Sequence, residues 1–406
     1  MKRSLQILPI SIFLGFFFLL SWYTLLGLQT LITGVYFPIA FWFIVILFSG
    51  ALLYAIQSIA SRGMDLFFKI AAHAFLVFFV SELCFALLLF AGDLYRGFYA
   101  IVHLIFEHEF LSPSRNTYWI SFAIIVFLFS ILLFLYGIVK GKYAYKVIKH
   151  TLYFDDLPAA FDGFTITQIS DVHAGSLKDS KAVQKGIDLI QKQQSDLFVF
   201  TGDLVNNKAE EIKPWLSHFS QIKAPHGQFS VLGNHDYGDY IKWPNDRAKA
   251  ENLEHLKGYH ADLGFRLLLD EQVRIKKGNT EIALLGIENW GLGFSQKGDL
   301  QKALGSGAEG LFKILLSHDP SHWEAQVKKS SAKIQLTLAG HTHGMQFGIE
   351  AFGLKWSPVK FRYKHWAGIK AENGRILNIN RGFGFIGFSG RIGIWPEITV
   401  IEMKKS

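Results

Sequence analysis

The sequence predicts a mixed α/β fold for the carboxyl-terminal part of the chain, preceded by an α-helical transmembrane domain of about four spans. The amino-terminal third contains long apolar runs, whereas the remainder alternates short apolar runs with polar helical stretches. Long apolar runs are typical of membrane helices, and the alternation is typical of a sheet flanked by helices. We therefore predict a transmembrane helical domain over residues 1–142 and an α/β domain over residues 143–406.

The composition also indicates a part that lies in lipid. Of the 406 residues, 50% are hydrophobic and only 18% are charged, which is too apolar for a wholly soluble protein. Cys84 is the single cysteine, so any metal site must use nitrogen and oxygen ligands. The net charge of +8 fits the Lys and Arg excess that membrane proteins keep on one side of the bilayer, and we expect no nucleic acid partner.

Four apolar runs are long enough to cross a hydrocarbon core, which takes about 20 residues. They are residues 7–27, 35–57, 67–92 and 117–139. We expect the first run to be retained, because it lacks a clear signal-peptide cleavage site and three more runs follow. Residues 97–107 are too short to span and are expected to lie in the membrane interface. His73 and Glu82 fall in the third run, where an ionisable group is a functional hypothesis, although Glu82 equally suits pairing within the bundle.

The placement of Lys and Arg predicts the orientation of these spans. Eight basic residues would share one side: Lys2, Arg3, Arg62, Lys69, Lys140, Lys142, Lys146 and Lys149. The opposite side holds only Arg96 and Arg115, in a loop that also contains acidic residues. The domain after the last span is therefore predicted to be cytoplasmic.

Six strands are predicted in the α/β domain. They are residues 164–170, 196–202, 227–233, 281–287, 312–318 and 334–340. The apolar spacing of residues 179–194 predicts a helix between the first two. Residues 143–154 resemble another strand directly after the last span, and residues 396–403 resemble a closing strand.

Five of these strands end in side chains that can bind a metal. Those side chains are Asp171 and His173, then Asp203, then Asn234, His235 and Asp236, then His318, and finally His341 and His343. Ligands of open α/β sheets bind beyond the carboxyl ends of the strands, so these residues are expected to meet in one place. Clustered carboxylates repel one another without a cation, so the pattern predicts a metal site.

The ordered set Asp-x-His, Gly-Asp, Gly-Asn-His-Asp, His and Gly-His-x-His resembles that of the calcineurin-like metallophosphoesterases, over about residues 151–406. Residues 157–176, 340–348 and 380–403 resemble more narrowly the membrane-anchored, YkuE-like branch. This resemblance implies a four-layer α/β/β/α sandwich whose loops converge on a dinuclear metal centre.

The resemblance also implies the ligands of two divalent transition-metal ions. Asp171, His173 and His343 would hold one ion, Asn234, His318 and His341 the other, and Asp203 would bridge both. Nitrogen and oxygen ligands suit Mn, Fe or Zn rather than Ca.

Two further residues would carry catalysis by the same resemblance. His235 would stabilise the transition state or protonate the leaving oxygen, and Asp236 would orient His235. Two cations can clamp a phosphoryl group and activate a bridging water as hydroxide, so the implied reaction is phosphoester hydrolysis. Met345 stands where the family often has a second glycine, and Asn289 follows Glu288 where the branch often has an acidic pair, so substrate preference is where we expect a difference.

Weaker patterns have simpler interpretations. Residues 382–387, GFGFIG, match a dinucleotide fingerprint formally, but too few residues follow to complete such a unit. A turn that presents Arg381, and with it Arg391, to a substrate phosphate fits better. Ser317, His318 and Asp319 are consecutive and cannot align as a catalytic triad. The basic and aromatic run 354–366 is expected to contact anionic headgroups or an amphipathic substrate, with a solvated loop as the alternative.

The leading hypothesis is a membrane-anchored, dinuclear-metal phosphoesterase that hydrolyses phosphoester or pyrophosphate bonds of a lipid-linked substrate near the bilayer. Its basis is that the predicted catalytic domain follows the last span directly. One alternative is a tethered phosphatase or phosphodiesterase for soluble substrates. Another is a non-catalytic metal-binding sensor that signals through Glu82 or His73, against which the complete ligand set with His235 argues.

Overall fold

The computed structural model describes residues 4–62 and 65–406, and the chain divides into two compact units, Met1–Tyr136 and Gly137–Ser406. Lys2 and Arg3, which entered the orientation prediction, lie outside the described residues, as does the side chain of Arg62.

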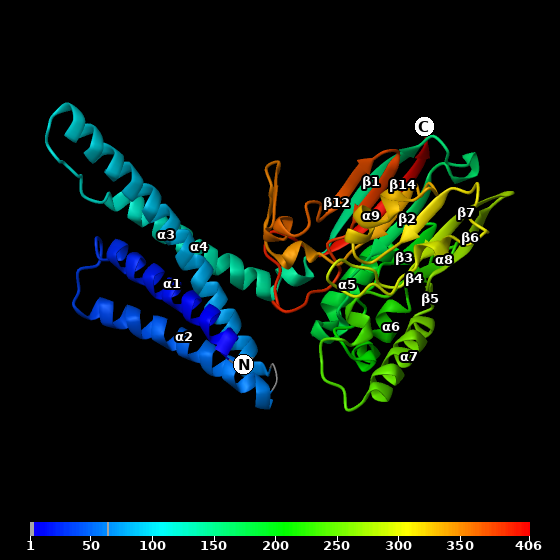
Figure 1. The fold of residues 1–406 in the computed structure, drawn as a ribbon, viewed down its shortest axis with the longest axis horizontal. Helices are drawn as coiled ribbons and strands as arrows, with labels where there is room; N and C mark the ends of the chain where they lie inside the picture. The colour runs from blue at the N-terminus through cyan, green and yellow to red at the C-terminus, as the bar shows by residue number, and fades with distance from the viewer. Residues whose placement is uncertain (1–3, 63–64) are drawn as a thin grey trace. The chain divides into compact units, whose positions relative to one another are not determined.

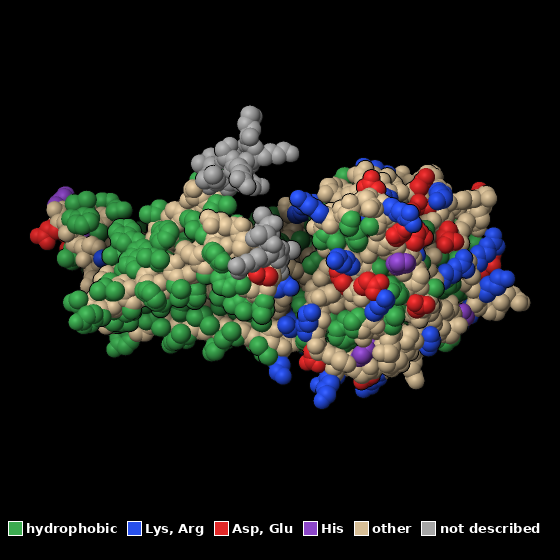
Figure 2. All heavy atoms as spheres, turned by 90° about the horizontal axis from the view of Figure 1, so that it is seen from below, with side chains coloured by type: hydrophobic (Ala, Val, Ile, Leu, Met, Phe, Trp, Pro, Cys, Tyr) green, Lys and Arg blue, Asp and Glu red, His purple; other side chains and the backbone are tan. Residues whose placement is uncertain are grey.

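The first unit consists of long helices (Figure 1). They are α1 (Ser4–Leu28), α2 (Tyr36–Arg62), α3 (Leu66–Phe106) and α4 (Thr117–Val139). All four are long and apolar enough to cross a membrane, which confirms the predicted number of spans. Hydrophobic side chains cover the face of this unit seen in Figure 2, whereas the second unit mixes Lys, Arg, Asp and Glu on its surface.

The third helix is longer than predicted. Residues 97–107 do not form a separate element, because α3 runs continuously from Leu66 to Phe106. Gly92 and Gly97 are tolerated inside it, no proline interrupts it, and Arg96 pairs with Asp93 one turn earlier at 2.8 Å. The residues that were expected to lie separately in the interface thus extend the third span.

Buried polar groups link the helices of the first unit. The hydroxyl of Ser21 in α1 donates to the fully buried carboxyl group of Glu82 in α3 at 3.1 Å. The hydroxyl of Tyr23 donates to Asp93 at 2.8 Å, and Arg115 pairs with the same carboxylate at 2.7 Å. Glu82 therefore has a hydrogen-bond partner within the helix bundle, which agrees with a role in pairing the helices.

Two six-stranded sheets and one separate hairpin form the second unit. The order in the first sheet is β1 (Lys146–Phe154), β14 (Glu397–Lys405), β2 (Phe164–Ile169), β3 (Leu197–Phe200), β4 (Gln228–Ser230) and β5 (Arg266–Leu267). The order in the second is β12 (Gly368–Glu372), β13 (Arg375–Ile379), β9 (Leu336–Ala339), β8 (Lys313–Leu316), β7 (Thr280–Gly286) and β6 (Glu271–Lys277). The hairpin pairs β10 (Ile349–Ala351) with β11 (Leu354–Trp356).

Helices cover the outer face of each sheet and complete four layers. They are α5 (Ser180–Gln191), α6 (Leu216–Phe219) and α7 (Asp246–Asp262) with the first sheet, and α8 (Leu300–Leu304) and α9 (Ser321–Ala325) with the second. Ile166, Val199, Leu284 and Leu338 belong to the apolar cluster between the sheets, which joins both. The predicted α/β/β/α sandwich is confirmed.

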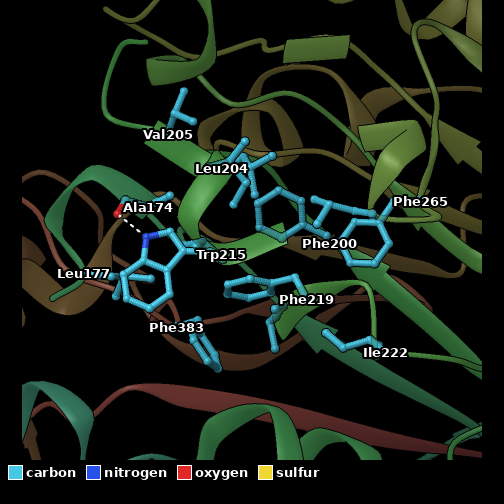
Figure 3. Packing of buried hydrophobic residues seen from close by; sticks show 14 of the residues in the cluster. Ala174, Leu177, Phe200, Leu204, Val205, Trp215, Phe219, Ile222, Phe265 and Phe383 are labelled. Carbon is cyan, nitrogen blue, oxygen red and sulfur yellow. Dashed lines mark hydrogen bonds between the residues drawn. The ribbon is translucent and has the colours of Figure 1, made fainter. Parts of the chain in front are cut away.

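The core beneath α5 and α6 shows how the sequence builds an outer layer. Val183, Ile187 and Ile190 recur at helical spacing in α5 and are buried, and Asp179 caps the helix by accepting from the amide of Ala182. Aromatic side chains fill the space below, and the indole of Trp215 donates to the carbonyl of Ala174 at 3.1 Å (Figure 3). This packing fixes the loop after β2, which carries two predicted ligands.

The six predicted strands exist, but each ends earlier than predicted. β3, for example, ends at Phe200 although the predicted strand extends to Gly202, because the ligand-bearing loop leaves the sheet there. The short strand β5, the edge strands β6 and β12, the hairpin and β13 were not predicted. Their sequences carry charged residues at alternate positions or are too short to show a period.

Candidate metal centre

The predicted ligands meet beyond the carboxyl ends of strands from both sheets. β2, β3 and β4 run parallel in one sheet, and β8 and β9 run parallel in the other, so each set delivers its following loops to one edge. Six predicted ligands form two groups, and the ligand atoms within each group lie within 4.8 Å of one another. The groups are Asp171, His173 and His343, and Asp203, His318 and His341.

The carboxylate of Asp203 reaches both groups. Its Oδ2 lies 3.5 Å from Nε2 of His173 in the first group and 3.3 Å from Nε2 of His318 in the second. The amide of His235 donates to the other oxygen, Oδ1, at 2.8 Å and fixes the carboxylate. One buried carboxylate therefore lies within reach of both ligand groups.

Asn234, the seventh predicted ligand, lines the same pocket and is buried. Its Nδ2 donates to the hydroxyl of Tyr240 at 2.7 Å, while its Oδ1 has no hydrogen-bond partner within the described part of the chain. A buried oxygen without a partner is uncommon, and a cation would satisfy it.

Two pairs of histidine rings are also arranged so that a cation would satisfy them. Nε2 of His173 lies 3.0 Å from Nε2 of His343, and Nδ1 of His341 lies 3.2 Å from Nε2 of His318. Two imidazole lone pairs at this separation repel unless a proton or a cation lies between them. The donor set of nitrogens and carboxylate oxygens suits transition-metal ions.

The backbone of the ligand loops is strained. Five of the seven predicted ligands have left-handed φ angles, which side chains other than glycine rarely adopt. The angles are 54° for Asp171, 46° for His173, 60° for Asp203, 71° for His341 and 50° for His343. Such conformations cost about 1 kcal/mol or more each and persist where the surrounding structure enforces them, commonly at functional sites.

Most ligand groups are held in the protonation state that binds metal. Burial opposes ionisation of Asp171, but the neighbouring His343 and His318 hold the pKa of its carboxyl well below the usual range. Burial lowers the pKa of His341 to about 4, so its imidazole is neutral near pH 7. His318 differs, because the charge of Asp203 outweighs burial and raises the pKa of His318 to about 10. A cation bound there would displace that proton.

His235 lies at the edge of the metal-ligand groups and belongs to neither. Its Nδ1–H donates to the carbonyl of Asn206 at 2.9 Å, and its ring lies 4.3 Å from the ring of Tyr240 at an angle of 31°. Both contacts fix the imidazole, and Nε2 remains for a group in the pocket that His235 lines.

Asp236 holds the backbone of the ligand loops instead of orienting His235 directly. One of its oxygens accepts from the amides of Gly233 and Asp203, at 2.8 and 2.9 Å. The other accepts from the amides of Leu204 and Val205. The structure therefore corrects the expected contact: Asn206 orients the imidazole, and Asp236 ties the loop after β3 to the loop after β4.

Arg381 does not reach the pocket, contrary to the prediction that it contacts a phosphate. Its guanidinium is buried and forms ion pairs with Glu397 and Glu350, so both carboxylates occupy the positions that a phosphate would need. Arg391 is fully buried as well and places Nη2 3.2 Å from Nδ1 of His343. The arginine that lines the pocket is Arg362.

Sequence reasoning missed the contribution of Asp319. This buried carboxylate lies 3.4 Å from Nε2 of His341 and accepts from the hydroxyl of Tyr363 at 3.1 Å. It therefore holds the ring of His341 with Nδ1 turned toward His318. The signal in the sequence is the position of Asp319 directly after His318.

The two groups open into a pocket of about 630 Å³. Asp203, Asn234, His235, His341 and His343 line its polar side. Its other walls are largely apolar and comprise Phe294, Met345, Pro358, Val359, Phe361, Ile386 and Phe388. A ligand of this pocket would place one end among carboxylates and imidazoles and another against hydrocarbon and aromatic rings.

Two family profiles match this chain. One, described as the transmembrane domain of a probable calcineurin-like phosphoesterase, matches residues 4–142, and the other, described as calcineurin-like phosphoesterase, matches residues 164–345.

Relatives with related names occur in bacteria and in an animal. The chain is 29% identical to the uncharacterized metallophosphoesterase YkuE of Bacillus subtilis over 268 residues, which are 64% of this chain and 86% of the relative. It is 26% identical to a transmembrane protein with a metallophosphoesterase domain from Danio rerio, covering 70% of this chain and 63% of the relative. The phosphodiesterase YaeI of Escherichia coli is 25% identical, over 64% of this chain and 88% of the relative.

Proposed function

Because the chain is a multi-pass membrane enzyme of the calcineurin-like metallophosphoesterases, in the YkuE-like branch, we propose that it hydrolyses a phosphoester or pyrophosphate bond of a lipid-linked substrate. The observation that carries this proposal is the pocket, in which metal-ligand side chains adjoin an apolar wall. A phosphorylated headgroup would lie among the ligands, and the adjoining part of the lipid would lie against the wall.

The proposed centre holds two divalent transition-metal ions, of the Mn, Fe or Zn type. Asp171, His173 and His343 would bind one, Asn234, His318 and His341 the other, and Asp203 both. When bound, two such ions supply Lewis acidity toward the phosphoryl oxygens and activate water as the nucleophile.

The side chains around this centre have separate tasks. In its doubly protonated form, His235 would donate a proton or a hydrogen bond from Nε2 to the leaving oxygen, because its Nδ1–H is already committed to the carbonyl of Asn206. Asp236 would hold Asp203 and Asn234 in position by accepting from the backbone amide of Asp203 and from that of Gly233, which directly precedes Asn234. Arg362, at the wall of the pocket, would offer a cation to an anionic substrate.

The experiment that tests the substrate class uses the full-length protein in detergent. Lipids extracted from the native membrane are incubated with the metal-loaded enzyme, and mass spectrometry follows loss of phosphorylated lipids, with bis(p-nitrophenyl) phosphate as the soluble comparison. We expect both to be hydrolysed, and an Asp203→Asn variant to hydrolyse neither. Hydrolysis of the soluble diester alone would favour a tethered phosphodiesterase for soluble substrates. Full metal loading with no turnover of any phosphoester would favour the sensor.

We also propose that the catalytic unit lies on the cytoplasmic side. The support is the group of basic residues that follows α4, namely Lys140, Lys142, Lys146 and Lys149. A reporter that is active only in the cytoplasm, fused after Ser406, is expected to be active. A periplasmic or extracellular reporter that is active at the same position would reverse the assignment.

A further inference from the structure

The hairpin β10–β11 presents its apolar side outward. Paired residues of an antiparallel hairpin share a face, and successive residues alternate between faces. The register pairs Ile349 with Trp356, Ala351 with Leu354, and Glu350 with Lys355. One face is therefore wholly apolar and the other carries the two charged residues. The apolar residues are exposed, with Leu354 64% and Ile349 52% accessible.

Polar contacts hold the hairpin in this orientation. Glu350 pairs with the buried guanidinium of Arg381, which is itself paired with Glu397 at the start of β14. The amine of Lys355 donates to the carbonyl of Ala367 at 2.6 Å and lies 5.2 Å from the ring centre of Trp366. The charged face thus packs against the rest of the second unit, and the apolar face is exposed. An ordinary surface hairpin has the opposite arrangement. These contacts also give Arg381 a function in the fold.

The tip of the hairpin is apolar as well. Phe352 is fully exposed, has a φ of 54°, and is followed by Gly353 with a φ of 78°. Two successive positive φ angles define a type I′ turn, whose first central position strongly favours asparagine, aspartate or glycine. A phenylalanine there lacks both a conformational advantage and burial within the unit. The hairpin projects from the rest of the second unit, drawn in orange in Figure 1.

We propose that this hairpin is an interfacial anchor that inserts its tip and apolar face into an anionic lipid surface. Exposed apolar residues of this density mark a binding surface. Exposed basic residues, Lys360 and Lys364, follow β11 in the sequence and flank the exposed Phe361, so an anionic surface is attracted to the same segment. A second copy of the chain is a poorer partner for this segment, because it would bring its own lysines against Lys360 and Lys364.

Exposed apolar residues on both sides of the hairpin in the sequence belong to the pocket. Met345 and Phe361 are exposed and also line the pocket, and they bracket the hairpin in the sequence. A hairpin in the headgroup region would bring the mouth of the pocket close to the lipid. The anchor itself follows from the hairpin alone and does not depend on the proposed substrate.

The test measures the depth of the hairpin tip in the full-length protein, reconstituted in liposomes. Cys84→Ser removes the natural cysteine, and Phe352→Cys accepts an environment-sensitive NBD fluorophore. Asn279→Cys is the matched control, because it occupies the exposed turn between β6 and β7, a polar hairpin of the same unit. Liposomes contain phosphatidylcholine alone or with phosphatidylglycerol, with and without a lipid spin-labelled near the headgroup.

We expect the probe at position 352 to emit at shorter wavelength and to lose about half or more of its emission to the spin-labelled lipid, more so with phosphatidylglycerol. The probe at position 279 should show neither effect. Adding Ile349→Asp and Leu354→Asp should return the probe at 352 to the behaviour of the control.

Equal behaviour of the two probes in both lipid compositions would overturn the anchor. A shift that lacks lipid quenching and grows with the protein-to-lipid ratio would assign the hairpin to a second copy and overturn it too. Lipid hydrolysis measured on the same samples separates the two proposals. A quenched tip without lipid hydrolysis would support the anchor and contradict the lipid-linked substrate. Lipid hydrolysis with a water-exposed tip would support the lipid-linked substrate and contradict the anchor.

Discussion

Asp203→Asn is expected to release both metal ions and to lower phosphodiester hydrolysis by at least about a thousandfold, because the cations carry most of the transition-state stabilisation. The reason is geometric: a single oxygen, Oδ2, lies within 3.5 Å of a histidine from each ligand group. An amide has the same shape but is neutral and offers one acceptor oxygen instead of two. Elemental analysis of the purified protein and bis(p-nitrophenyl) phosphate hydrolysis measure the two effects.

The control for Asp203→Asn is Asp262→Asn, which makes the same chemical change at an exposed position at the end of α7. It should retain metal and activity. If the Asp203 variant kept two equivalents of metal and near-normal activity, the bridging assignment would be wrong and the catalytic centre would have to lie elsewhere.

His235→Ala is expected to keep both metals and to lower kcat by about a hundredfold to ten-thousandfold, the usual contribution of general acid catalysis. The imidazole lies in neither ligand group, so metal binding does not need it. The loss should depend on the leaving group. An aryl ester releases a weakly basic phenolate and needs little protonation, whereas an alkyl ester releases a strongly basic alkoxide, so the alkyl ester should lose more.

The matched control is His255→Ala, which removes an exposed imidazole from α7. An equal loss of activity for aryl and alkyl esters, accompanied by loss of metal, would make His235 a structural residue. An equal loss without loss of metal would assign it to charge stabilisation in place of proton transfer.

The convergence of most candidate ligands could be predicted because these residues obey a topological regularity. Strand ends show in a sequence as apolar runs that stop, and parallel strands bring their carboxyl ends to one edge. Asp171 and His343 are far apart in the chain yet lie 3.1 Å apart, because β2 and β9 end at the same edge of the sandwich. The four spans were visible for an equally simple reason, the length of apolar helix that a bilayer requires.

Contacts that depend on side-chain packing could not be predicted. Asp236 follows a histidine directly, so sequence proximity indicated that it orients this histidine, but its oxygens accept from backbone amides of another loop. Arg381 lies next to a glycine-rich turn that resembles a phosphate loop, yet Glu350 and Glu397 neutralise it. Neither partner of Arg381 is near it in the sequence, and a single sequence contains no signal that pairs them.

The position of β14 has a consequence for biosynthesis. β14 lies between β1 and β2 and pairs with both, although β1 and β2 precede the other strands of the unit and β14 follows them all. Before β14 has been synthesised, the membrane helices are complete, but the edges of β1 and β2 that will pair with β14 are open. Unpaired strand edges can pair with strands of other chains. The carboxylate of Glu397, which neutralises Arg381, arrives with the same strand. The catalytic unit therefore closes last around its final strand, and the nascent chain depends until then on protection of those two edges.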